Sequence, residues 1–207
     1  MASNTTAQPG FVHLHVHSAY SLLEGALPIG KLAEFAKADK QPALALTDTD
    51  NMFGTLEFSE KLAGYGIQPI IGCALPVTGL GERAQDRWAC TPAVTLLAQS
   101  EEGYLNLMAL SSQAYLEGEG DPAVPWRAVA ERSDGLILLS GGPDGPVGPV
   151  LAGGKTGEGA RVLDAMREAF DGRFYVELQR HGSALEDAAE PHLVDYAYDR
   201  DIPLVAT

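Results

Sequence analysis

The chain has 207 residues and a formal net charge of −14, from 28 acidic and 14 basic side chains. A protein that binds duplex DNA through its phosphates needs clustered Lys and Arg, so this composition argues against direct DNA binding. An acidic surface favours either a basic protein partner or plain solubility. The hydrophobic content of 45% is that of an ordinary globular protein, which excludes disorder over most of the chain.

The two cysteines, Cys73 and Cys90, do not have the CxxC spacing of a metal or redox motif. Two cysteines without this spacing indicate reduced thiols, and therefore a cytoplasmic protein. No apolar stretch approaches the roughly 18 residues of a membrane span, so no membrane segment is predicted. Residues 1–10 lack the features of a signal peptide and predict a short disordered tail, with a single domain over 11–207.

Short apolar runs alternate with helical patterns along the rest of the chain. Seven runs predict strands: Phe11–Val16, Ala43–Thr47, Pro69–Cys73, Val94–Ala98, Leu136–Ser140, Phe174–Leu178 and Leu204–Ala206. Several are apolar at consecutive positions, which is typical of strands covered on both faces. Helical spacing predicts six helices: one beginning near Pro28, then 56–63, 104–115, 126–132, 162–170 and 192–198, with Pro191 near the start of the last.

Repeated β–α units predict an α/β domain with a parallel sheet and right-handed crossovers. Residues 79–90, 117–125 and 140–159 are rich in Gly, Pro and charged residues and predict irregular loops. The final residues, IPLVAT, coincide with a predicted strand. We therefore expect a fragment of a longer protein. In parallel barrels the active site lies at the carboxyl ends of the strands, so we expect some site residues to follow Thr207.

Three histidines, His13, His15 and His17, alternate along the first predicted strand. A period of two would place all three on one face, and an HxH pair suits a metal ion. A polar strand end facing a wet pocket explains the pattern equally well. Glu24 follows in a SLLEG turn, either as a third ligand or as a surface acid before Gly25.

Asp48 and Asp50 follow the second predicted strand, where ligands occur in barrels. Asp48 could also cap the next helix or orient a neighbouring histidine. His181 either reaches the same pocket or lies in a solvated loop, and His192 is expected to be structural. Neither cysteine has a histidine nearby in sequence, which argues against a Cys/His nucleophile.

Seven segments, in order, resemble the N-terminal PHP (polymerase and histidinol phosphatase) domain of the bacterial DNA polymerase III alpha subunit. They are FVHLHVHSAYSLLEGA, PALALTD, GIQPIIGC, LLAQSEEGYLNL, GLILLSGG, FYVELQRHG and PLVAT, and they span 11–207. The resemblance implies a distorted seven-stranded TIM-like β/α barrel, truncated at its C-terminal end. It also implies that the polymerase palm, thumb and fingers regions lie outside this chain.

The resemblance implies a depleted metal site. His15, His17 and Glu24 match ligands of metal-binding members, whereas the positions of a histidine, a glutamate, a histidine and a cysteine hold Thr49, Ala74, Ala93 and Gly142. Two last ligands would follow Thr207. His13, Asp48 and His181 are candidates for supporting residues around the pocket. We expect no tightly bound metal, and at most one weakly bound zinc or manganese ion, so no activated hydroxide.

Three functions follow from the resemblance. The first, favoured by the replaced ligands, is a catalytically silent structural and docking module of a replicative DNA-directed DNA polymerase. Its partners would be the rest of the alpha subunit and the proofreading exonuclease subunit, with DNA contacted only by the missing polymerase regions. The second is an active metal-dependent phosphoesterase or 3′–5′ exonuclease, and the third is a free-standing small-molecule phosphatase. A paralogue used in mutagenic repair remains an alternative for the parent polymerase.

Overall fold

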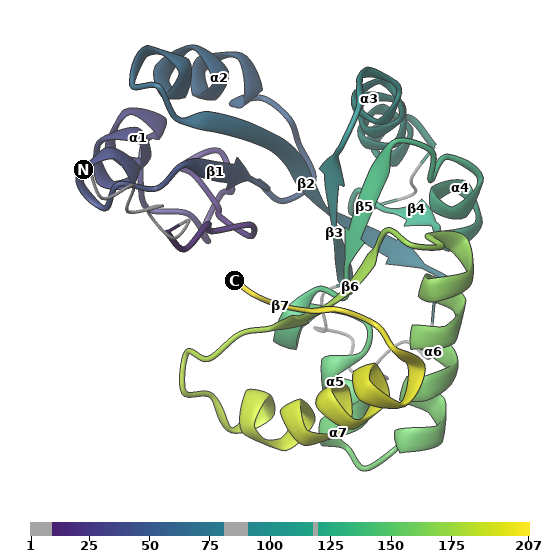
Figure 1. The fold of residues 1–207 in the computed structure, drawn as a ribbon. Helices are drawn as coiled ribbons and strands as arrows, with labels where there is room; N and C mark the ends of the chain where they lie inside the picture. The colour runs from purple at the N-terminus through teal and green to yellow at the C-terminus, as the bar shows by residue number, and fades with distance from the viewer. Residues whose placement is uncertain (1–9, 81–90, 118–119) are drawn as a thin grey trace, which may run out of the picture.

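The computed structural model describes residues 10–80, 91–117 and 120–207. Most of the predicted tail, and most of the first predicted loop together with Cys90, lie outside the described residues. The described chain forms a curled sheet of seven strands with helices packed around it (Figure 1). The predicted α/β class and barrel-like curvature are therefore confirmed.

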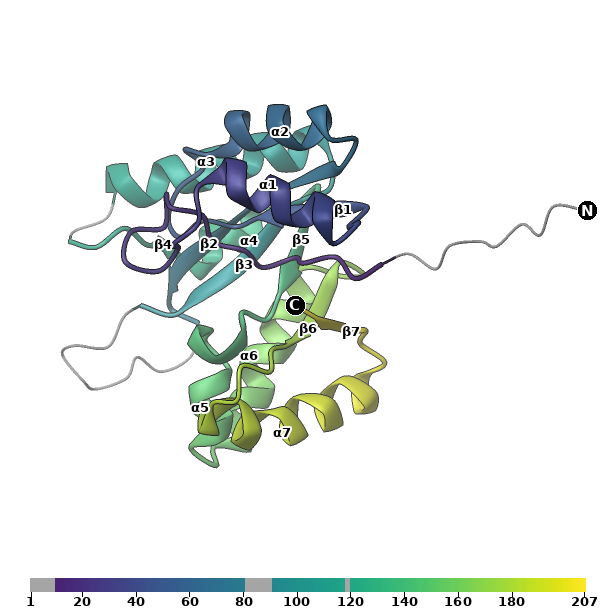
Figure 2. The same ribbon diagram turned by 90° about the vertical axis from the view of Figure 1, so that its left-hand side faces the viewer.

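The strands are β1 (Ala43–Leu46), β2 (Gln68–Thr78), β3 (Ala93–Ala98), β4 (Val124–Pro125), β5 (Leu136–Leu139), β6 (Phe174–Leu178) and β7 (Leu204–Ala206). The helices are α1 (Ile29–Ala38), α2 (Thr55–Gly64), α3 (Glu101–Glu117), α4 (Trp126–Glu131), α5 (Gly148–Ala152), α6 (Thr156–Ala169) and α7 (Ala184–Arg200), with a 3-10 turn η1 (Gly142–Asp144). Helices α1 and α2 lie at one end of the sheet and α5, α6 and α7 at the other (Figure 2). Each described helix falls short of the length and apolar character that a membrane span needs.

The strand order is β1-β2-β3-β5-β6-β7, with β4 beside β2. The prediction of an all-parallel sheet is wrong, because β3 runs antiparallel to both β2 and β5. Parallel neighbours need a crossover, usually a helix, whereas the sequence between β2 and β3 carries no helical pattern. A chain that returns directly to the same sheet pairs antiparallel.

The first predicted strand, Phe11–Val16, is also wrong as a strand. This segment runs beside β1 with two backbone hydrogen bonds, from Ala45 N–H to the His13 carbonyl and from Thr47 N–H to the Val16 carbonyl, both 2.9 Å. The two acceptors are three positions apart in the chain, whereas the two donors are only two positions apart, so an extra residue interrupts the ladder. Val16 N–H then donates to the Thr47 side chain rather than to backbone (2.8 Å).

The apolar strand runs are covered on both faces, as predicted. Leu96 and Leu138 pack towards the helices in the large core, whereas their chain neighbours Leu97 and Leu139 form a small apolar cluster with Ala45 on the other face. All five are nearly or fully buried. Strand β2 extends the predicted Pro69–Cys73 to eleven residues because it pairs successively with β1, β3 and β4.

Two loop predictions and one helix start need correction. Residues 117–125 contribute β4, and 140–159 contain η1, α5 and the start of α6, because the apolar residues Val147 and Leu151 are buried. Helix α7 begins at Ala184, so Pro191 and His192 lie inside it and not at its start. Ser183 and Glu186 form a capping box that fixes the earlier start.

Candidate functional site

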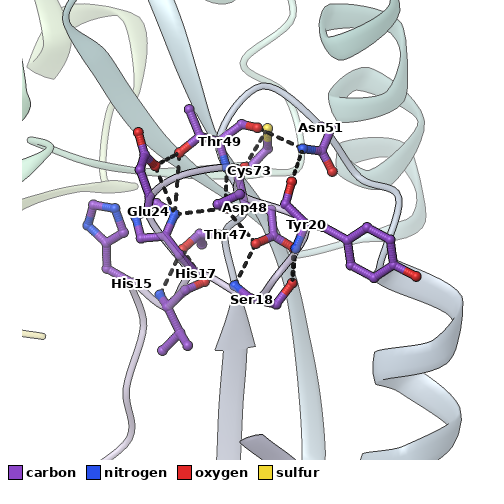
Figure 3. Close-up of polar contacts among 12 residues, drawn as sticks. His15, His17, Ser18, Tyr20, Glu24, Thr47, Asp48, Thr49, Asn51 and Cys73 are labelled. Atoms are coloured by element: carbon purple, nitrogen blue, oxygen red, sulfur yellow. Dashed lines mark hydrogen bonds and ion pairs between the residues drawn. The ribbon is translucent and has the colours of Figure 1, made fainter. Parts of the chain in front are cut away.

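A polar cluster lies where the N-terminal segment passes the carboxyl end of β1 (Figure 3). Asp48, two residues after the end of β1, is fully buried. One of its carboxylate oxygens accepts hydrogen bonds from the Ser18 N–H and the Ser21 hydroxyl (both 2.6 Å), and the other accepts from the Ser18 hydroxyl (2.8 Å). Asp48 thus holds the turn at 18–21 in place. It does not cap α2, whose start has no side-chain cap.

His17, Glu24 and Thr49 meet at this turn. The Thr49 hydroxyl donates to the Glu24 carboxylate (2.5 Å) and lies 3.4 Å from His17 Nδ1. The distance from His17 Nδ1 to the Glu24 carboxylate is 3.8 Å, and the Ser21 hydroxyl lies 3.2 Å from the same nitrogen. The Ser21 hydroxyl therefore links His17 to Asp48, because it donates to Asp48 and lies against His17 Nδ1. A carboxylate linked to a histidine in this way is expected to orient the imidazole.

His15 has a different set of partners. Its Nδ1 lies 2.8 Å from the Glu177 carboxylate and 3.0 Å from the Gln179 amide nitrogen. The rings of His15 and His17 are neighbours, with centroids 5.1 Å apart, although their hydrogen-bond partners are different residues. The His15 side chain is 11% exposed and that of Glu177 is fully buried.

Glu177 on β6 is the residue that sequence reasoning missed. Its carboxylate also accepts from the Thr207 hydroxyl (2.6 Å), the Gln179 amide (2.8 Å) and the Gly141 N–H (3.1 Å). Burial by itself would raise the pKa of Glu177, but the hydrogen bond and charge of His15, with the Thr207 and Gln179 hydrogen bonds, hold that pKa below its ordinary value. A lone carboxylate inside the apolar run FYVEL was the available sequence signal, because charged groups are seldom buried unless they are paired.

The four replaced ligand positions are found around the same cluster, and two of them face each other. Thr49 and Ala74 form an isolated parallel bridge between the β1 end and β2. Ala93 begins β3 and pairs with Pro76. Gly142 has a positive φ of 61°, and a Cβ there would meet the Gln179 side chain at 2.7 Å. These atoms form the end of the Gln179 side chain, so a larger residue at 142 would have to displace that side chain and would also be strained by the positive φ.

The other predicted residues lie outside this cluster or serve structure. His13 is exposed, with its ring edge against Phe11. The His181 side chain is 71% exposed and bonds to Glu186 at the start of α7 (2.9 Å), so it is a loop histidine. Cys73 is fully buried and its thiol donates to the Asp48 carbonyl (3.3 Å). Burial, with the nearby charges of Asp50 and Asp48, strongly raises the pKa of this thiol, which disfavours the thiolate needed for catalysis or metal binding.

Asp50 completes the polar rim. It has a positive φ of 66°, and one carboxylate oxygen is buried with no hydrogen-bond partner among the described residues. Burial, and then the charges of Glu24 and Asp121, raise the pKa of Asp50 to about 6. The negative charges of Glu24 and Asp121 thus act on Asp50, while His17 lies 3.8 Å from the Glu24 carboxylate.

The donors do not fit a metal centre of the kind that the family resemblance implies. Within residues 10–80, 91–117 and 120–207, no three His, Cys, Asp or Glu side chains are arranged to hold an ion. Thr49 and Gly142 offer no imidazole or thiolate, and the space beside Gly142 is taken by Gln179. A metal-dependent catalytic step therefore has no ligand set among the described residues.

Comparison with known proteins identifies the family. The PHP domain model matches residues 13–181. The chain belongs to the PHP domain family. This PHP domain is 56% identical over 200 residues to the DNA polymerase III subunit alpha of Caulobacter vibrioides, covering 96% of the chain and 18% of that relative. It is 41% identical over 208 residues to the same subunit of Treponema pallidum, covering 97% of the chain and 18% of that relative.

A solved structure shows the same fold. A proposed metal-dependent phosphoesterase from Bifidobacterium adolescentis superposes with a TM-score of 0.60 at 13% identity, covering 97% of this PHP domain and 87% of that chain. At this identity the likeness concerns the fold alone. The PHP domain spans less than a fifth of the length of the polymerase subunits that it matches.

Proposed function

We propose that this PHP domain is part of a DNA polymerase III alpha subunit and acts there as a catalytically silent structural and docking module. The identity of 56% to an alpha subunit over 96% of the chain is the observation that carries the assignment to this parent. DNA synthesis would belong to polymerase regions outside the chain. The partners would be those regions and the proofreading exonuclease subunit.

The replaced ligand positions support catalytic silence. Phosphoester hydrolysis on a metal-dependent barrel needs ions that lower the pKa of a bound water. Here the Thr49 hydroxyl bonds to Glu24 instead of providing an imidazole, and Gln179 fills the space beside Gly142. His15 Nδ1 lies against the Glu177 carboxylate, which also accepts a hydrogen bond from the Gln179 amide. The side chains that would hold a metal ion therefore bond to other protein groups.

Metal analysis tests this proposal. The protein, in the 207-residue form and as the full-length subunit, is dialysed against a chelator and then against metal-free buffer, and its zinc and manganese contents are measured. We expect neither ion to be retained and no phosphoester cleavage above the level of a His15→Ala variant. Two or more retained ions per chain, lost together with cleavage activity in His15→Ala, would establish an active phosphoesterase instead.

Binding measurements test the docking role. Full-length subunit and subunit lacking residues 1–207 are titrated with the exonuclease subunit from the same organism. We expect deletion to weaken binding strongly while the polymerase regions keep primer extension. Equal affinity with and without the PHP domain would refute docking and leave a structural role.

A further inference from the structure

Helix α3 carries an exposed apolar stripe on the side turned away from the sheet. The helix lies on the outside of the curled sheet (Figure 1), and its exposed uncharged positions recur at intervals of three and four residues, so they share one face. We define the α3 stripe by its six members: Leu105, Met108, Ala109, Ser112, Tyr115 and Leu116. The four large side chains among them are between 37% and 83% exposed. Contiguous exposed apolar surface of this kind marks an interaction site.

The opposite face of α3 already provides the packing that the domain needs. Leu107, Leu110 and Ala114 are almost completely buried in the large core. Gly103 lies so close to the loop before β5 that an added Cβ would collide with the Gly135 carbonyl. The helix is therefore apolar on two sides, although one side is enough to hold it on the sheet. Helices that are apolar all round are typically buried on all sides.

The α3 stripe also lacks the charges that a solvated helix face usually carries. The charged side chains of this 17-residue helix are Glu101, Glu102 and Glu117, which lie at its two ends. Helix α1, by contrast, carries three exposed charged side chains within ten residues. An uncharged apolar face over about three turns of α3 therefore favours a permanent cover, because permanent interfaces are more apolar than those that form and dissociate.

The length of the relatives indicates what can cover the stripe permanently. The chain covers 18% of each of the two alpha subunits compared above, so more than four fifths of such a subunit is further polypeptide. A segment of the same polypeptide is present at a high effective concentration and loses less freedom on packing than a separate molecule does. A second copy is disfavoured, because each copy carries a net charge of −14 and two copies repel each other.

We propose that the α3 stripe is the surface against which the polymerase regions of the same alpha subunit pack, through a helix with an apolar face. The small residues Ala109 and Ser112 in the middle of the stripe let a second helix approach closely, and Leu105 and Leu116 extend the contact towards both ends. This inference rests on the proposed parent protein and adds the surface and the chemistry of the contact.

Hydroxyl-radical labelling tests the proposal, because it reports the solvent exposure of individual side chains. The full-length alpha subunit is compared with the 207-residue chain, and the labelling rates of Met108 and Tyr115 are measured by mass spectrometry. We expect both residues to lose most of their labelling in the full-length subunit. Tyr198 on α7, which is 78% exposed, is the internal control and should be labelled alike in both proteins.

A Leu105→Glu/Leu116→Glu variant gives a second readout. In the 207-residue chain both changes face solvent and should leave the melting temperature unchanged. In the full-length subunit they would bury charges against apolar side chains, so the labelling of Tyr115 should rise to its level in the 207-residue chain. The matched control, Tyr198→Glu, should leave the labelling of Tyr115 unchanged. A lower melting temperature of the double variant in the 207-residue chain would show that the stripe stabilises the domain itself and would contradict the proposal.

The remaining outcomes separate this inference from the proposed parent. If the reading frame encodes no polymerase region, the parent assignment fails. If the full-length subunit extends a primer but Met108 and Tyr115 are labelled as fast as in the 207-residue chain, the parent stands and the α3 stripe is the wrong surface. An equal loss of labelling at Tyr198 would also refute a contact specific to α3. Protection that appears only on adding the exonuclease subunit, or only at high concentration of the 207-residue chain, would assign the stripe to another partner or to a second copy and would refute the proposal as well.

Discussion

Replacement of Glu177 by glutamine tests whether this buried carboxylate holds the polar cluster together. Glutamine preserves volume but turns one oxygen into an NH2 group. That group must face either the Gly141 N–H or the three donors from His15, Gln179 and Thr207. At least one buried donor then loses its acceptor, and the paired charge is removed from a site with no exposed surface.

The expected loss is large for so small a change. An unsatisfied buried group costs about 1–3 kcal/mol and breaking a buried ion pair about 3–5 kcal/mol, so we expect Glu177→Gln to lower the free energy of unfolding by about 2–4 kcal/mol. For a chain of this size, this corresponds to a fall in the melting temperature of about 5–15 °C. Denaturant titration of the 207-residue chain measures the free energy directly.

The pH dependence gives an independent check. Because the folded-state pKa of Glu177 is lowered, its contribution is present above the ordinary Glu pKa of about 4.3 and is lost as the pH falls through the lower folded value. The difference between wild type and Glu177→Gln should therefore shrink below pH ~4. The control, Glu131→Gln, breaks an exposed pair with Arg127 and should leave the midpoint unchanged. Equal melting of Glu177→Gln and wild type at neutral pH would refute the reasoning.

Three further substitutions have defined outcomes. Asp50→Asn should raise the free energy of unfolding at neutral pH by about 1 kcal/mol, after allowance for the partial exposure of Asp50, and should give no gain below pH ~4. The reason is that the folded-state pKa of Asp50 is raised, so its ionisation costs stability as the pH rises from about 4 to 6. An equal gain at both pH values in denaturant titrations would count against this explanation. Leu138→Asp buries an unpaired charge in a fully buried β5 position and should cost several kcal/mol, so an unchanged melting temperature would remove β5 from the core. Gly142→Cys meets both a positive φ and the Gln179 side chain, so calorimetry should show a lower melting temperature and metal analysis no gain in zinc; zinc retained after chelation would contradict it.

Sequence periodicity determined most of the elements but not the direction of every strand. Consecutive apolar residues such as Leu96 and Leu97 correctly predicted strands covered on both faces, because local pattern records which faces are buried. The reversal of β3 depends on how its chain returns to the sheet. The segment at Phe11–Val16 has a strand-like pattern, yet its hydrogen bonds to β1 are out of step by one residue, and only the tertiary pairing shows this.

The site divides in the same way. The sequence by itself was enough to predict, from the family resemblance, that His15, His17 and Glu24 lack four companion ligands, since that prediction depends only on residue identity at Thr49, Ala74, Ala93 and Gly142. Only the tertiary structure decided what surrounds them, because Glu177 and Gln179 approach from β6, more than 160 residues away in the chain. Hydrogen bonds between such distant positions have no local periodicity. The carboxylate bound to His15 and the side chain filling the space beside Gly142 therefore became visible only when the sheet curled to bring β6 against the N-terminal segment.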